Sequence, residues 1–186
     1  MSKLLYRLVL TTAVLLLGLL GGSYVIAQTV DSAHINDLLQ QTKDRAAQAN
    51  RDAELIESFT RSRTSWNSHA TQLTSMTQHI NAMGKLLTEM DTARAEGSPW
   101  QQEAIDEVEP LLRSMADHLT TMIDYLNKHQ GRVHMPEYVD YARANRELSD
   151  KLLALVEDYA DYSRSKARVE MLEQKLQIPA AVPSEE

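Results

Sequence analysis

Apolar residues recur at alternating steps of three and four along most of this chain, and no segment alternates with the period of two that is typical of a strand. The 3-4 spacing places apolar side chains along one face of a helix. In one run the interval is a regular seven residues: Phe59, Trp66, Leu73, Ile80 and Leu87. The sequence therefore predicts an all-α protein in which each helix buries one seam.

Three short segments predict where helices begin and end. Gly97 is a candidate C-cap, and Ser98-Pro99-Trp100-Gln101 combines an N-cap, a proline at the first helical position and a glutamine that completes a capping box. Gly131 and Pro136 predict the next end and start, and a last helix from about residue 136 to 177.

The first seam after residue 30 is rich in alanine, so it lets a neighbouring helix approach closely. Asp31 or Ser32 can cap this helix, and the seam residues are Ile35, Leu39, Thr42, Ala46, Ala49, Ala53 and Ile56. Its phase differs from that of the next seam, which predicts a turn near residues 60–65. We expect an up-down-up-down four-helix bundle with an overlong C-terminal helix. The alternative is a three-helix bundle with one very long first helix, over residues 31–95.

The last helix carries its own seam of tyrosine and leucine, with one asparagine. The seam residues are Tyr138, Tyr141, Asn145, Leu148, Leu152, Leu155, Tyr159 and Tyr162. Lys166 and Glu173 then interrupt it, so the final turns should project from the bundle. We expect that end to bind a helical protein partner or to mediate self-association.

The N-terminal 27 residues have the pattern of a signal peptide. Lys3 and Arg7 are basic, residues 8–20 are apolar, and Val25-Ile26-Ala27 resembles a cleavage site. The alternative is an uncleaved anchor over residues 8–27, which is long enough to span a bilayer. Residues 28–177 then form the bundle and residues 178–186 a disordered tail. We expect an exported protein, periplasmic or secreted.

Charge and cysteine content exclude several classes of function. Loss of the two basic signal residues takes the formal net charge from −7 to −9, and no basic stripe is present, which argues against nucleic acid as a partner. Membrane association is expected only if the N-terminal segment stays uncleaved. The chain contains no cysteine, so disulfides and thiolate chemistry are excluded.

One short pattern occurs twice, as M-x-x-H-[I/L]-x-x-M over residues 76–83 and 115–122. Each copy places two thioethers and one imidazole on one helix face. In a hairpin that turns at residues 97–98, the two copies face each other across the helix pair. Met76 should lie beside Met122, Met83 beside Met115, and His79 beside His118, within about one helical turn of level.

Thioether and imidazole donors without thiols suit copper, particularly Cu(I), so the repeat is a candidate metal site. The competing interpretation is that the methionines fill the core and the histidines reach its edge, which is the commoner role of such stripes. A haem held by His79 and His118, with the alanines leaving room for the ring, is a third and weaker alternative. No C-x-x-C-H is present for covalent attachment.

No catalytic motif is present: the sequence contains no Glu-x-x-His, no G-x-S-x-G and no phosphate-binding glycine loop. Asn145 lies on a seam, roughly level with Met122, and is expected to be a buried polar residue that fixes helix register. The leading hypothesis is a non-enzymatic exported bundle that acts as a binding or interaction module. Periplasmic copper binding is the alternative.

Overall fold

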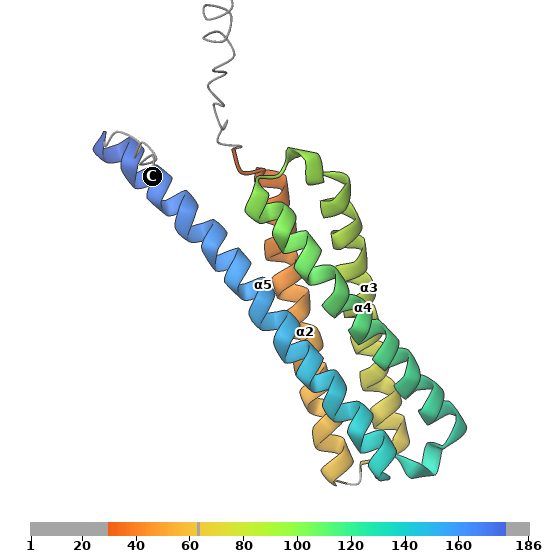
Figure 1. Cartoon of the computed structure of the whole chain (residues 1–186). Helices are drawn as coiled ribbons and strands as arrows, with labels where there is room; N and C mark the ends of the chain where they lie inside the picture. The colour runs from red at the N-terminus through yellow and green to blue at the C-terminus, as the bar shows by residue number, and fades with distance from the viewer. Residues whose placement is uncertain (1–29, 63, 178–186) are drawn as a thin grey trace, which may run out of the picture.

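The computed structural model describes residues 30–62 and 64–177, and this part of the chain is helical without strands. Four long helices pack against one another: α2 (Ala33–Ser62), α3 (Trp66–Thr92), α4 (Pro99–Lys128) and α5 (Pro136–Leu176) (Figure 1). Two short 3-10 helices, η2 (Arg94–Glu96) and η3 (Gln130–Arg132), lie in the connections. The expected signal peptide and C-terminal tail lie outside the described residues.

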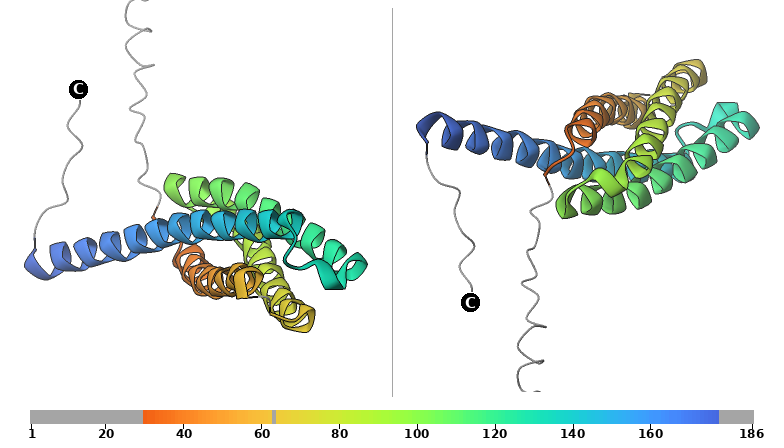
Figure 2. Two further views of the ribbon diagram at one scale, coloured as in Figure 1. Left: turned by 90° about the horizontal axis from the view of Figure 1, so that it is seen from below. Right: turned by 90° about the horizontal axis from the view of Figure 1, so that it is seen from above.

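Each helix packs mainly against two others. The α2 helix contacts α3 and α5, and the α4 helix contacts the same two (Figure 2). The α2 helix ends before α3 begins, so the turn expected near residues 60–65 is present and the alternative with one long first helix is not what the chain forms. No helix among the described residues is long and apolar enough to cross a membrane.

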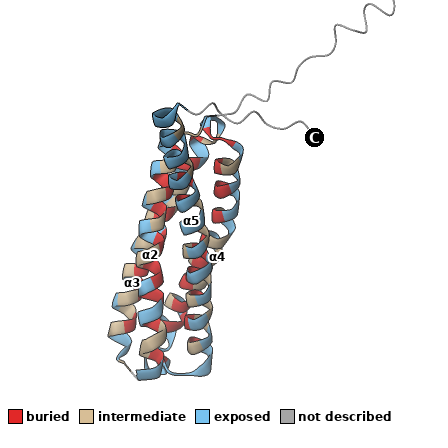
Figure 3. Ribbon diagram, turned by 90° about the vertical axis from the view of Figure 1, so that its left-hand side faces the viewer, coloured by how far each residue is buried: buried red, intermediate tan, exposed pale blue. Residues whose placement is uncertain are grey.

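Buried residues recur along all four helices and alternate with exposed ones (Figure 3). All seven predicted seam residues of α2 are buried. On α4 the apolar residues with 3-4 spacing are buried as well: Val108, Leu112, Met115, Leu119, Met122 and Leu126. On α3 the seam begins later than predicted. The predicted seven-residue run crosses the break between two helices, since Phe59 lies on α2 and Trp66 is the first residue of α3. Trp66 keeps 38% of its surface exposed.

The α5 helix is rotated relative to its predicted seam. Tyr138, Asn145 and Leu152 are buried as expected, whereas Tyr141, Leu148 and Leu155 are only partly buried. The positions that complete the buried face are mostly small: Ala142, Ser149, Val156, Ala160 and Ser163. Small residues on α5 and the alanines of α2 let these two helices pack closely.

Polar side chains also join α2 to α5. Asn50 on α2 donates through Nδ2 to Ser149 Oγ at 3.2 Å and to Asp150 Oδ1 at 2.7 Å. Asn50 and Ser149 are both buried, so this pairing satisfies polar groups that would otherwise destabilise the contact.

Gln101, at the start of α4, ties that helix to the start of α2. Its Oε1 accepts hydrogen bonds from the backbone N–H of Ser98 and from that of Ser32, each at 2.9 Å. Its Nε2 donates to Ser32 O at 2.9 Å and to Asn36 Oδ1 at 2.8 Å. The glutamine expected in a local capping box therefore also makes a tertiary connection between two helix ends.

Candidate functional site

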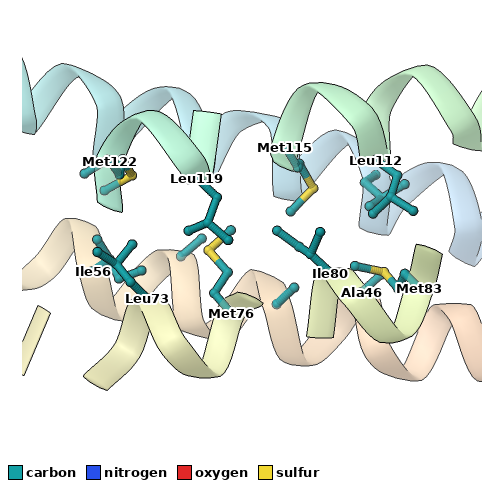
Figure 4. Close-up of a cluster of buried hydrophobic side chains, with 14 of the residues drawn as sticks. Ala46, Ile56, Leu73, Met76, Ile80, Met83, Leu112, Met115, Leu119 and Met122 are labelled. Carbon is teal, nitrogen blue, oxygen red and sulfur yellow. The ribbon is translucent and has the colours of Figure 1, made fainter. Parts of the chain in front are cut away.

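The four methionines of the repeated motif lie in the main core between α3 and α4. Met76, Met83, Met115 and Met122 each have 0% of their surface exposed. Figure 4 shows their side chains among Leu, Ile and Ala residues from the surrounding helices. Packing of flexible side chains in an irregular core accounts for all four.

The motif methionines meet aliphatic side chains across the α3–α4 pair. Figure 4 shows Met76 next to Leu119, Met115 next to Ile80, and Met83 near Leu112 and Ala46. Met76, Met83 and Met115 therefore lie next to aliphatic side chains in this layer of the core. Ala46 is one of the alanines that were expected to leave room for a haem ring.

Both motif histidines are partly buried, at the edge of the core. His79 Nε2 lies 3.5 Å from Asp52 Oδ2 on α2, and Asp52 also accepts a hydrogen bond from Gln72. His118 lies seven residues before Tyr125, which packs against Tyr138 and Tyr141 of α5, so this face of α4 is turned toward α5.

Groups of three or more His, Asp or Glu placed to hold a metal are absent from residues 30–62 and 64–177. That finding does not concern methionine donors. Copper or haem binding by the Met/His motif therefore stays a prediction, and none of the contacts of these six side chains favours it over core packing.

Asn145 on α5 contacts the methionine core directly. It is 1% exposed, and its Nδ2 donates to Met122 Sδ at 2.8 Å. Its Oδ1 is buried without a hydrogen-bond partner in the described part of the chain. This amide is therefore half satisfied, and it directs one polar group at the sulfur of one motif methionine.

A second buried polar pair lies where α3 meets α5. His69 on α3 is fully buried, its Nδ1 lies 3.1 Å from Tyr138 Oη, and its ring packs edge-on against Tyr138 and against Phe59 of α2. Burial lowers the pKa of His69 to about 4 and raises that of Tyr138. His69 Nε2 has no hydrogen-bond partner among the described residues.

The sequence pattern places both members of this pair on seams but does not pair them. The same hairpin register that pairs Met76 with Met122 would also pair His69 with His129, but His129 is exposed and its ring lies against Tyr125. His69 and Tyr138 each combine an aromatic ring with a polar group and occupy core-facing positions on different helices. That combination is the signal that could have indicated the pair.

An aromatic groove lies between α4 and α5, near the start of α2. Trp100 stacks on Tyr159 with ring centroids 6.4 Å apart, and Tyr162 meets Trp100 edge-on at 5.0 Å. Trp100 Nε1 donates to Asp31 Oδ1 at 2.9 Å, and Lys166 Nζ lies 2.8 Å from the same oxygen. The lysine expected to interrupt the α5 seam therefore anchors α5 to the segment before α2.

Comparison with protein-family models, curated proteins and solved structures found no match. A function for this chain therefore has to be inferred from its own sequence and geometry.

Proposed function

We propose that this protein is an exported, non-enzymatic helical bundle that acts as an interaction module and that binds a second copy of itself through the end of α5. In this proposal the four helices run up-down-up-down and the last one extends beyond the other three. The N-terminal signal pattern supports export, and the absence of catalytic motifs from the sequence supports a non-enzymatic role.

An uncovered apolar stripe at the end of α5 carries the proposal. Tyr162, Val169, Leu172 and Leu176 are 50%, 52%, 39% and 62% exposed, respectively. Ser163 is the last buried residue of α5, which continues to Leu176, and the end of the helix lies away from the other three in Figure 1 and Figure 2. The spacing of these four side chains is that of the a and d positions of a coiled coil.

The stripe continues a face of α5 that α4 covers further down the bundle. Leu148 and Leu155 precede Tyr162 at seven-residue intervals, and both pack against the core. The α4 helix begins at Pro99, and Trp100 contacts Tyr162, so α4 starts close to the level where the stripe becomes exposed. The α5 helix of a second copy would bury the exposed stripe, as α4 buries the preceding part of the same face.

Charge complementarity supports a second copy in parallel orientation. With Val169 at an a position, Arg168 is at g and Glu173 at the following e. In a parallel pair, g on one chain faces e of the next heptad on the other, so Arg168 meets Glu173 of the second copy twice across the dimer axis. In the described part of the chain, neither residue takes part in a salt bridge.

The expected affinity is low. Burying the exposed half of eight apolar side chains contributes roughly 1 kcal/mol each, and association costs at least ~4 kcal/mol. The balance of about 4 kcal/mol corresponds to a Kd near ~1 mM. If the N-terminal segment is uncleaved, anchoring on one membrane would raise the local concentration of the two copies.

Disulfide trapping tests the proposal, since the chain has no cysteine of its own. Leu172→Cys, at a d position, should form a disulfide-linked dimer under mild oxidation. Met171→Cys is the matched control, because Met171 is 57% exposed and lies off the stripe. Equal dimer yields from both variants would show random collision, and no dimer from Leu172→Cys would exclude the parallel pair.

A truncation gives an independent check. Sedimentation of the chain from residue 28 with and without residues 166–186, near millimolar concentration, should show self-association only with the segment present. A monomer in both cases would remove the self-association proposal.

A further inference from the structure

The aromatic groove has the composition of a cation-binding site. It encloses about 390 Å³ and is lined by Trp100, Glu107, Leu155, Asp158, Tyr159 and Tyr162. Three of these six residues are aromatic and two are acidic, and no basic residue lines the groove. It lies apart from the Met/His motif and from the stripe residues beyond Tyr162.

The ring geometry presents aromatic surface from two directions. The planes of Trp100 and Tyr159 are inclined by 15°, whereas Tyr162 is inclined by 75° to Trp100. The hydrogen bond from Trp100 Nε1 to Asp31 holds the indole in place. The face of an aromatic ring carries partial negative charge, so rings held at a corner attract a positive group that lies against them.

The two carboxylates of the groove favour a positively charged ligand. Glu107 Oε2 accepts a hydrogen bond from Tyr159 Oη at 2.9 Å, and Asp158, which also lines the groove, directly precedes the same tyrosine in the sequence. Burial, together with Glu107, raises the pKa of Tyr159 to about 12, so its ring stays a neutral phenol at ordinary pH. An anion would be repelled by both carboxylates.

Desolvation then selects among cations. A primary ammonium group must replace three strong hydrogen bonds to water, and the groove wall is mostly aromatic and aliphatic carbon. A quaternary ammonium group has no N–H to satisfy, and its methyl groups fit an apolar wall. Aromatic residues with nearby carboxylates are the usual means by which proteins bind such groups.

We propose that the groove formed by Trp100, Tyr159 and Tyr162 binds a small quaternary ammonium compound, whose cationic head lies against the rings and beside Glu107 and Asp158. The site does not depend on self-association through α5, because all its lining residues come from one chain. Parallel pairing would cover one side of Tyr162, so binding is measured at micromolar protein, well below the concentration expected for dimers.

Tryptophan fluorescence provides the measurement. The chain has two tryptophans, and Trp66→Phe leaves Trp100 as the reporter. Choline titrated at constant ionic strength should give a saturable change in Trp100 emission. The probe 3,3-dimethylbutan-1-ol, a neutral compound of the same shape, should give a response at least about tenfold weaker, because it lacks the charge.

Variants separate the site from a general effect. Tyr162→Leu and Glu107→Gln, made in the Trp66→Phe chain, should each weaken choline binding by about tenfold or more. Tyr141→Leu is the matched control: this tyrosine is on the same helix, only partly buried, and outside the groove. Tyr162 and Glu107 are exposed, so these variants should keep the helical circular dichroism of the parent.

Two outcomes would overturn the inference. Equal responses to choline and to the neutral alcohol would mean that the groove is an apolar surface without preference for a cation. No saturable response to choline, with helical content intact, would mean that the rings pack only against one another. Neither outcome bears on disulfide trapping at Leu172, so failure of this site and failure of self-association are distinguishable.

Discussion

Acidification should destabilise this bundle through one residue, His69. Its ring is fully buried against Phe59 and Tyr138, and burial lowers its pKa from the ordinary value of 6.5 to about 4. The unfolded chain therefore binds this proton more readily than the folded chain does. Because the unfolded state takes up more protons between pH 6.5 and 4, the free energy of unfolding falls as the pH drops through that window.

The size of the loss follows from the two pKa values. A difference of about 2.5 units corresponds to roughly 3 kcal/mol between neutral pH and pH 4. Above pH 6.5 this residue contributes no pH dependence, because it is neutral in both states. Protonation of His69 in the folded state would add a buried positive charge. The protonated Nε2 would have no hydrogen-bond acceptor among the described residues.

Urea denaturation at a series of pH values, followed by circular dichroism, measures this effect. His69→Gln keeps an acceptor for the Tyr138 hydroxyl but does not titrate, so its free energy of unfolding should fall less than that of the parent, by roughly 3 kcal/mol. His34→Gln, a change at an exposed histidine of α2, is the control and should follow the parent. Parallel pH profiles for the parent and His69→Gln would refute this account of the buried pair.

Three further experiments test other parts of the structure. Gln101→Ala should lower the free energy of unfolding by about 1–3 kcal/mol, because it leaves buried partners at two helix starts unpaired. Asn145→Leu removes a half-satisfied buried amide, so urea denaturation should show little loss of stability or a gain. Equilibrium dialysis with elemental analysis tests the copper hypothesis, which expects about one copper per chain. The metal should be lost in His79→Ala and His118→Ala but kept in His34→Ala; equal loss from all three would indicate adventitious binding.

The buried faces of α2 and α4 were predictable because an almost unbroken series of apolar residues at 3-4 spacing, rich in alanine on α2, marks one side of each helix. On α5 the same reasoning failed in part, because residues such as Ala142 and Ser149 carry no hydrophobic signal yet form the face nearest α2. Their burial depends on how closely the two helices approach, which is a property of the pair. Sequence periodicity describes one helix at a time.

The candidate sites also combine features that the sequence predicts with features that depend on how two helices pack. The sequence identified the repeated motif, but the level at which Met76 meets α4 depends on the path of the connection through η2. His69 and Tyr138 are 69 positions apart in the sequence. In the aromatic groove, Trp100 and Tyr159 are 59 positions apart. Local patterns cannot predict which seam residues from different helices will meet, because that depends on helix rotation and register.

A mixing experiment tests the central claim, self-association through the end of α5, most directly. In the Leu172→Cys chain, Arg168→Glu and Glu173→Arg should each reduce disulfide trapping, because each sets like charges opposite one another in the parallel pair. An equimolar mixture of these two variants should form mixed dimers in preference to either homodimer, since every facing pair is then of opposite sign. A statistical mixture of the three dimers would contradict the parallel α5 pair.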